Sequence, residues 1–395
     1  MSILFSPIPV GRIEIENRFV QSATYEAMAN EKGEVTDELI NRYKNLAKAG
    51  VGLIIPGYMY VHPAGRAMPK QAGIHTEEMI PGLKRLVEAV HQQGGKIALQ
   101  LAHGGLQTSK AIIGQAPLAP SGGLRNPMTF EKGKEMSQPE IEETIRAFAQ
   151  AARRAAEAGA DAVQLHGAHG FLLSEFLSPF FNRRKDSWGG SEEGRFRIVK
   201  EIVQETRKVL PGRTPVLIKI NGNDFTPKEG VTAELAKKYA ARLRNLEIDA
   251  VELSCGTFFT FHTVRGEIPS KELVKVLPGW MRLLAKLQFR KLRPRCSFVE
   301  AYNLAAAKMI KPELGNIPLI LVGGVRRLSH MEDLVERKYA DLVSMSRPFV
   351  REPFLVQRFK EGKAEQAACI SCNKCFAAIA NGLPVRCYVD GLPPL

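Results

Sequence analysis

The sequence predicts an α/β fold, a closed (β/α)8 TIM barrel with an N-terminal hairpin and a short C-terminal extension that contains cysteines. The main observation is a strand-then-helix alternation that repeats over most of the 395 residues. Eight nearly continuous apolar segments suit parallel strands that are buried on both faces. These expected strands are Phe19–Ala23, Val51–Pro56, Lys96–Leu101, Asp161–Leu165, Pro215–Ile220, Asp249–Ser254, Pro318–Val322 and Asp341–Met345.

A recurring joint and a missing motif support closure into a barrel. Residues 49–53 resemble residues 158–163, and residues 248–251 resemble residues 339–343. Joints that recur indicate a repeated supersecondary unit, and eight β-α units in one chain favour a barrel. A doubly wound open sheet is the alternative, but no Gly-x-Gly-x-x-Gly follows the first expected strand.

The expected helices begin at polar capping residues. Thr36 is placed to cap a helix that ends near Gly50. Ser137-Gln138-Pro139-Glu140 has the pattern of a capping box. Thr232 and Ser329 are expected to open two more helices, with Glu332 completing a second capping box.

Three segments lie outside the repeat. Residues 3–15 predict a hairpin over the bottom of the barrel. Residues 257–298 form a long insertion after the sixth strand, at the end of a barrel where functional loops usually lie. We therefore expect a barrel over residues 1–360 and a cysteine-rich tail over residues 361–395.

Composition and net charge limit the classes of protein to which this chain can belong. Hydrophobic residues make up 45% of the chain and charged residues 24%, as in ordinary globular proteins. No apolar run is long enough to cross a bilayer, and the N-terminus lacks signal-peptide features, so a cytoplasmic protein is expected. The net charge is +14, and part of it is a run at Arg290, Lys291, Arg293 and Arg295. We interpret the excess as solvated surface or as a hint of an anionic ligand, because no nucleic-acid-binding motif accompanies it.

Polar residues and glycines recur where the expected strands end. In a barrel these ends meet at one rim, where catalytic groups lie, and the last two loops there usually hold a phosphate. Backbone N–H groups of paired glycines can approach a phosphate closely. The residues at these positions are Ser22, Ala23, Thr24, Tyr25, Gly57, Gln100, His166, His169, Lys219, Gly323, Gly324, Ser346 and Arg347.

Several motifs in this order resemble the old yellow enzyme family. They are Asn17-Arg18-Phe19-Val20, the run at residues 100–105, and His166-Gly167-Ala168-His169-Gly170. A longer run from Glu175 to Arg195 is the most specific of them. The resemblance covers about residues 1–360 and is closest to the NADH:flavin oxidoreductase and 2,4-dienoyl-CoA reductase branch.

The resemblance implies an FMN-dependent oxidoreductase of the ene-reductase type. NAD(P)H would reduce the flavin, which would reduce the activated C=C bond of an α,β-unsaturated carbonyl or enoyl thioester. His166 and His169 would bind the substrate carbonyl oxygen, and Lys219 would stabilise the anionic reduced flavin. Ring contacts are implied for Ser22, Ala23, Thr24, Gly57 and Gln100, and phosphate contacts for Gly323, Gly324, Ser346 and Arg347.

One position departs from the family pattern. Many members carry a proton-donating tyrosine two residues after the second histidine, where this chain has Phe171. Either the proton comes from Tyr25, Tyr58 or water, or the preferred substrate differs from that of the family. Tyr25 is the first candidate, because it follows the first strand at a position that tunes the flavin in the family. The alternative is that Tyr25 only packs on the ring.

Four of the six cysteines lie in the tail as Cys-x2-Cys-x2-Cys-x11-Cys. Such clustering favours a metal over disulfides, and thiolates at this spacing suit an iron–sulfur cluster or zinc. The segment resembles the 4Fe–4S segment of dienoyl-CoA reductases, although the third cysteine comes one residue early. The alternative is a vestigial tail or one that zinc stabilises. The proposed ligands are Cys369, Cys372, Cys375 and Cys387.

Other functions stay open. One alternative is a flavin and iron–sulfur electron-transfer protein without a C=C substrate of its own, and another is a barrel aldolase or decarboxylase. The expected partners are a small-molecule substrate and either a second copy of the chain or a separate electron-donor protein. The insertion carries Trp280 and the phenylalanines 258, 259 and 261. It would cover a ligand, contact another subunit or lie on a membrane surface.

Overall fold

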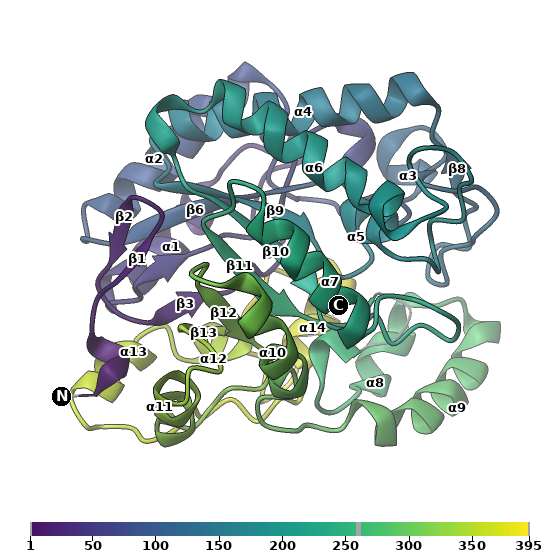
Figure 1. The fold of residues 1–395 in the computed structure, drawn as a ribbon. Coiled ribbons are helices and arrows are strands. Elements are labelled where there is room, and N and C mark those ends of the chain that lie inside the picture. The colour runs from purple at the N-terminus through teal and green to yellow at the C-terminus, as the bar shows by residue number, and fades with distance from the viewer. Residues whose placement is uncertain (1, 258–261, 394–395) are drawn as a thin grey trace.

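A computed structural model describes residues 2–257 and 262–393 of the chain. Eight parallel strands form a closed ring in which each strand pairs with the next, and the last pairs with the first (Figure 1). The ring strands are β3 (Phe19–Gln21), β4 (Leu53–Ile54), β6 (Lys96–Ala102), β9 (Ala162–Gly167), β10 (Val216–Asn221), β11 (Ala250–Ser254), β12 (Leu319–Val322) and β13 (Leu342–Met345). The barrel and all eight expected strands are confirmed.

The strands are apolar because both of their faces are buried. One set of side chains packs inside the barrel and includes Val20, Leu53 and Leu217. The neighbouring positions pack outward against the helices. A short additional strand, β5 (Met59–Tyr60), pairs with β6 outside the ring. A second small pair, β7 (Leu118–Ala119) and β8 (Lys134–Glu135), lies in a loop.

The predicted N-terminal hairpin is present. Strands β1 (Ile8–Val10) and β2 (Ile13–Ile15) pair antiparallel. Ile8, Val10 and Ile15 pack with the first residues of the barrel strands, so the hairpin closes the end of the barrel where the strands begin.

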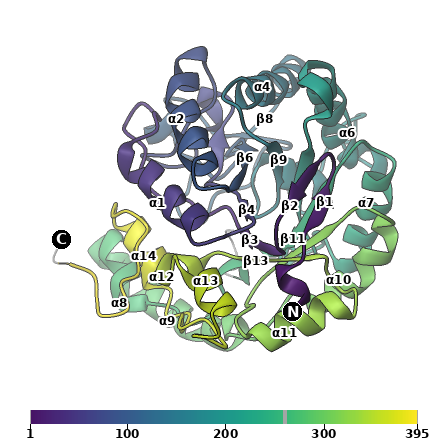
Figure 2. The same ribbon diagram turned by 90° about the vertical axis from the view of Figure 1, so that its left-hand side faces the viewer.

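Helices surround the ring (Figure 2). The longer ones are α1 (Asp37–Lys48), α2 (Ile80–His91), α4 (Gln138–Glu157), α6 (Glu192–Val209), α7 (Ala233–Arg244), α10 (Leu304–Ile310), α11 (Leu328–Glu336) and α13 (Leu355–Lys360). Shorter ones are α3 (Lys110–Ile113), α5 (Leu172–Leu177) and α12 (Arg347–Arg351).

The capping predictions are confirmed in three cases out of four. Thr36 and Thr232 cap α1 and α7, and the capping box at Ser137 opens α4. The expectation for Ser329 is wrong, because α11 begins one residue earlier with Arg327 as its N-cap. Glu300 accepts the Arg327 backbone N–H at 2.9 Å, so a distant carboxylate replaces the local cap.

The insertion and the tail pack together beside the barrel. The insertion forms α8 (Ser270–Leu273) and α9 (Arg282–Leu292), and the tail forms α14 (Lys374–Ala380). They share a small apolar core of their own, which includes Leu273, Phe289 and Ala377. Residues 258–261, with three of the insertion's phenylalanines, lie outside the described residues. Among the described helices, none has the length and apolar character needed to cross a bilayer.

Candidate active site

A buried ion pair lies inside the barrel. Lys219 Nζ lies 3.3 Å from Oε2 of Glu252, and the two side chains are 2% and 0% exposed. Lys219 also donates to Ser22 Oγ at 2.8 Å, and that hydroxyl donates to Glu252 Oε1 at 2.7 Å. Strand register explains the arrangement, since Lys219 on β10 is paired with Glu252 on β11 and with His166 on β9. Three adjacent strands therefore bring these polar side chains to one level.

Two glutamines extend this network around the barrel. Gln164 donates to Glu252 Oε2 at 3.0 Å, and Gln100 donates to Gln164 Oε1 at 2.5 Å. Ser344 donates to the other carboxylate oxygen at 2.9 Å. Gln100 Oε1 is buried and has no hydrogen-bond partner among the described residues. A buried polar atom without a partner is costly, so this edge of the network suits a polar ligand.

Gly57 is required by a second buried carboxylate. Its N–H donates to Glu26 Oε1 at 2.6 Å, and the same oxygen accepts from the Tyr43 hydroxyl. A Cβ at position 57 would lie 2.2 Å from Glu26 Oε2, so no larger side chain fits. Burial raises the pKa of Glu26, and the hydrogen bonds from Tyr43 and Gly57 oppose that rise.

The two histidines at the end of β9 lie together. Their ring centroids are 5.1 Å apart. His169 Nε2 lies 2.7 Å from Ser254 Oγ, whereas His166 Nδ1 is buried without a partner among the described residues. Burial lowers the pKa of both rings well below the ordinary value, and the nearby Lys219 charge lowers it further. Both imidazoles are therefore neutral at pH 7, and each carries one N–H donor.

His169 has a backbone conformation that is unusual for its residue type. Its φ is +66°, in the left-handed region, and its N–H donates to Asn221 Oδ1 at 3.2 Å. Non-glycine residues persist in this region when the surrounding structure holds them there, and such residues cluster at functional sites.

Two aromatic rings, those of Tyr58 and Phe171, pack beside His166, and a third stacks on Tyr58. The centroid of Tyr58 lies 5.7 Å from that of His166 and 4.7 Å from that of Phe171. Tyr25 stacks on the other side of Tyr58 at 5.9 Å. The Tyr25 hydroxyl donates to the carbonyl of Pro69, and burial raises the pKa of both phenols. Tyr58 is thus closer to the histidine than Tyr25 is.

The residues near the expected phosphate site of the cofactor are hydrogen-bonded to, or packed against, other residues of the chain. Thr24 Oγ1 and Ser346 Oγ are 2.6 Å apart, which joins the ends of β3 and β13. Ala23 packs next to them on the barrel core. Gly323 and Gly324 have φ of +128° and +73°, and a Cβ on Gly324 would lie 2.5 Å from the Val299 carbonyl. The glycines thus allow the 299–303 segment to approach closely.

Arginines gather beside these loops. Arg347 donates to the carbonyl of Arg265 at 2.8 Å and to the side chain of Asn373. Burial lowers the pKa of Arg326, an effect that Cys369 opposes and the nearby charge of Arg347 increases. Several half-buried cations in one place favour an anionic ligand. Arg265 and Arg326 were not among the predicted residues, although Arg326 follows the paired glycines by two positions.

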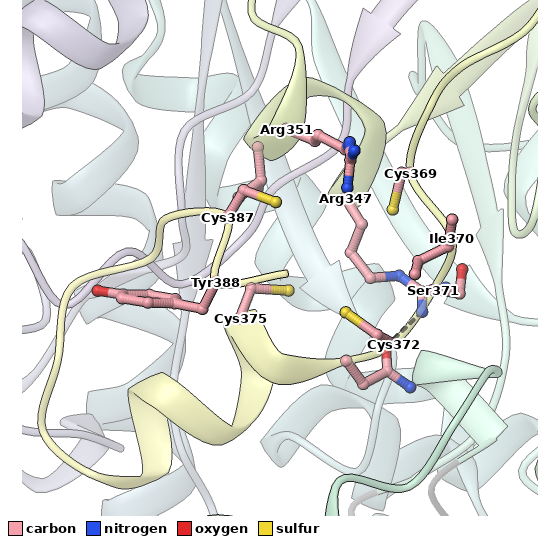
Figure 3. Close-up of a pocket in the computed structure, with 11 residues that line it drawn as sticks. Arg347, Arg351, Cys369, Ile370, Ser371, Cys372, Cys375, Cys387 and Tyr388 are labelled. Atoms are coloured by element: carbon pink, nitrogen blue, oxygen red, sulfur yellow. Dashed lines mark hydrogen bonds between the residues drawn. The ribbon is translucent and has the colours of Figure 1, made fainter. Parts of the chain in front are cut away.

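All four tail cysteines line one cavity, together with Arg347 and Arg351. The volume of this cavity is about 320 Å³ when the space at its opening to solvent is included. Figure 3 shows the four sulfur atoms pointing towards a common space. Burial raises the pKa of Cys375 to about 11. Among the described residues, no three His, Cys, Asp or Glu side chains are arranged for a single metal ion.

The donor set suits FMN at both of its ends. The unpaired Gln100 oxygen, Ser22 and the Lys219 ammonium offer hydrogen-bonding groups for the edge of a flavin ring. The guanidinium groups of Arg326 and Arg347 offer positive charge at the last two strands, where barrels usually hold a phosphate. The residues present therefore fit the cofactor that the motifs imply.

Comparison with known proteins decides the family. The model of the NADH:flavin oxidoreductase / NADH oxidase family matches residues 3–275 and 279–366. The chain belongs to this family. A 4,4'-dithiodibutanoate disulfide reductase of Rhodococcus erythropolis is 33% identical, over 98% of this chain and 94% of the relative. An NADPH dehydrogenase of Geobacillus sp. is 34% identical, over 89% of this chain and 92% of the relative.

A solved structure of a similar protein supports the fold. A 2-naphthoyl-CoA reductase in complex with 2-naphthoyl-CoA superimposes with a TM-score of 0.83 and is 24% identical. The superposition covers 98% of the present chain and 56% of the reductase chain. The present chain therefore spans about half the length of that larger protein. The prediction of an FMN- and NAD(P)H-dependent oxidoreductase of the ene-reductase type is confirmed at the level of the family.

Sequence reasoning missed three polar members of the site, which are Glu252, Gln164 and Glu26. Glu252 and Gln164 are polar residues in otherwise apolar strands, which was a usable signal. Their partners were not readable, because each lies on a different strand. Glu26 follows Tyr25 directly, but its contacts with Tyr43 and Gly57 depend on how two loops pack.

Proposed function

We propose that this flavoprotein reduces a C=C bond conjugated to a carbonyl group, and that the His166 and His169 pair binds that carbonyl. In this proposal Ser22, Gln100 and Lys219 hold the ring edge of FMN. Ala23, Thr24 and Gly57 lie beside the ring, and Gly323, Gly324, Ser346 and Arg347 lie at the phosphate. FMN held by these residues would supply hydride transfer from NAD(P)H to the substrate.

The observation that carries the proposal is the pair of neutral imidazoles. Two N–H donors aimed at one carbonyl oxygen stabilise the negative charge that develops there as the β-carbon is reduced. A protonated histidine would bind anions in the ground state as well, whereas neutral donors act mainly when charge develops. The hydrogen bond between His169 Nε2 and Ser254 Oγ orients one of these rings.

We test the function by separating its two half-reactions. Flavin released from the purified protein should be FMN by mass, and NADH or NADPH should bleach the bound flavin under anaerobic conditions. An enone such as 2-cyclohexenone should then restore the flavin absorbance. If 4,4'-dithiodibutanoate restored it while enones and enoyl thioesters did not, the activity of the Rhodococcus relative would replace our proposal.

The proton for the α-carbon comes, in this proposal, from Tyr58. Phe171 has no acidic proton, and the Tyr25 hydroxyl is hydrogen-bonded to Pro69, while Tyr58 packs on both His166 and Phe171. Tyr25 stays the alternative donor predicted from the sequence.

Replacing Tyr58 by Phe is expected to slow flavin reoxidation by the enone on the order of a hundredfold or more, because general acid catalysis typically contributes about a hundredfold to ten-thousandfold. Flavin reduction by NAD(P)H should be unchanged. Tyr25→Phe is the matched control, and stopped-flow absorbance measures both steps. If Tyr25→Phe gave the larger loss, the donor would be Tyr25.

We propose that the four tail cysteines hold a 4Fe–4S cluster, with zinc as the alternative. A single zinc with bonds of about 2.3 Å to sulfur would hold its ligands about 3.8 Å apart. The sulfur atoms instead surround a cavity, and no single-ion arrangement is found among the described residues. Arg347 and Arg351 supply positive charge for thiolates. Such a cluster would exchange electrons with a separate redox protein or with a second subunit.

Metal analysis of the anaerobically purified protein is expected to find iron and acid-labile sulfide in roughly equal amounts. Cys372→Ser should remove both and leave the flavin in place, because the predicted ring contacts come from other strands. Cys296→Ser is a matched control, since Cys296 lies in the insertion core. Stoichiometric zinc without sulfide would establish the alternative, and free thiols without metal would contradict both.

A further inference from the structure

One stretch of the insertion contains basic side chains but no acidic ones. Residues 273–299 hold no Asp or Glu, although the chain as a whole has 41 in 395 residues, which would give about three in a stretch of this length. The same stretch holds seven cations, which are Lys275, Arg282, Lys286, Arg290, Lys291, Arg293 and Arg295. All seven are exposed. Within the described parts of the chain, none of them forms an ion pair.

Helix α9 in this stretch has one face on the protein and one in solvent. Ala285, Phe289 and Leu292 pack against the core shared by the insertion and the tail. The opposite face is also apolar, which is unusual for a solvated helix. Its members are Leu283 (69% exposed), Leu284 (63%) and Leu287 (51%), and Trp280 (76%) is exposed in the 3-10 helix Gly279–Met281 just before α9.

Three of these apolar residues follow helical spacing on α9 and form a single stripe. Leu284 and Leu287 are three residues apart and Leu283 and Leu287 are four apart, so their side chains share one side of the helix. Trp280 lies three residues before Leu283, in the 3-10 helix that leads into α9, and is exposed there. Arg282, Lys286 and Arg290 run along the flank of the stripe. In both views α9 lies at the outer edge of the molecule (Figures 1 and 2). We call this surface the α9 face.

We propose that the α9 face docks on the surface of an anionic phospholipid bilayer. A helix with exposed Trp and Leu on one side and cations beside them lies in the plane of the membrane interface. The apolar stripe would enter the boundary of the acyl chains. The seven cations would lie among the lipid phosphates, where each contributes to binding.

Charge and shape favour this occupant over the others. A second copy of the same face would bring seven cations against seven, which repels. Nucleic acid offers phosphates, but its backbone offers no apolar layer for four exposed hydrophobic side chains. A bilayer that contains anionic lipid supplies both the negative charge and the apolar layer.

Vesicle sedimentation tests the proposal with the flavin-loaded full chain. We expect binding to vesicles of phosphatidylcholine with phosphatidylglycerol, little binding to phosphatidylcholine alone, and weaker binding at 0.5 M salt. Trp280 provides an internal reporter, because the only other tryptophan, Trp188, is 1% exposed. Its emission should shift to the blue on binding, and the shift should be absent in Trp280→Phe.

Two pairs of substitutions separate charge from apolar contact. Lys286→Glu/Arg290→Glu should weaken binding by at least about 25-fold, since each cation near such a surface is worth roughly fivefold. Leu284→Ser/Leu287→Ser should weaken it roughly tenfold or more. Lys84→Glu/Lys200→Glu is the matched control, with the same change in charge at exposed positions on α2 and α6. It should keep more than half of the binding.

Several results would overturn the proposal. They are no binding to anionic vesicles, equal losses in the control pair, or an unchanged Trp280 emission in the vesicle-bound protein. A dimer by light scattering that only the α9 variants dissociate, without vesicle binding, would assign the face to a second copy. Tighter binding of a labelled oligonucleotide than of vesicles would assign it to nucleic acid. Unchanged flavin absorbance and NAD(P)H-driven bleaching will show that the variants are folded.

Discussion

Replacing both His166 and His169 by alanine is expected to leave a yellow protein that NAD(P)H still reduces but that an enone reoxidises very slowly. Loss of one such donor typically costs on the order of a hundredfold in rate. Flavin binding should survive, because the predicted phosphate and ring contacts come from other strands. Stopped-flow absorbance at the flavin maximum measures the two half-reactions separately.

The structure distinguishes the two single variants. His169 bonds to Ser254, so Ser254→Ala removes an orienting contact without removing a donor. It should slow enone reoxidation less than His169→Ala does. His166 has no such partner among the described residues, so His166→Asn, which keeps an N–H donor, should retain part of the rate. An enone rate that is unchanged in the double alanine variant would place the carbonyl site elsewhere.

A pH profile offers an independent check. The pKa of both histidines is lowered by burial and by Lys219, so the folded protein keeps them neutral below their ordinary pKa of about 6.5. The reoxidation rate should therefore stay level as the pH falls from 7.5 to about 6.

The barrel was predictable from the sequence because its signals are local. Eight apolar segments that alternate with amphipathic helices, several of them with recognisable caps, specify parallel strands covered by helices, and the strand ends then identify the rim. The error at α11 shows the limit of such reasoning. Ser329 has a good local pattern, but the helix start is satisfied by Glu300, which binds the backbone N–H of Arg327 from 27 positions earlier in the chain.

The polar interior of the site was only partly predictable. Lys219 was visible as an isolated cation in an apolar strand, but its partner depends on the register between β10 and β11. The contact between Arg347 and Asn373 was hidden for a similar reason. It connects the residue that begins α12, just after the last barrel strand, to the cysteine tail. The two residues are 26 positions apart, so no local sequence pattern indicates that they meet. This contact places a predicted phosphate residue next to the proposed metal ligands.

Breaking the buried pair of Lys219 and Glu252 is expected to have the largest effect on stability. Lys219→Met would leave Glu252, which is 0% exposed, without its cation. Removal of one partner of a buried pair typically costs about 3–5 kcal/mol, because the remaining charge is buried and uncompensated. Urea unfolding followed by circular dichroism measures the loss.

Two further variants test whether the loss comes from the unpaired charge. Lys219→Met/Glu252→Gln should recover much of the stability, since a glutamine can keep hydrogen bonds with Ser22, Ser344 and Gln164 without a net charge. Lys238→Met breaks a surface pair with Glu192, whose side chains are 58% and 35% exposed, and should cost less than about 1 kcal/mol. If the double variant were as unstable as Lys219→Met, the lysine would stabilise the barrel by packing its carbon chain rather than by its charge.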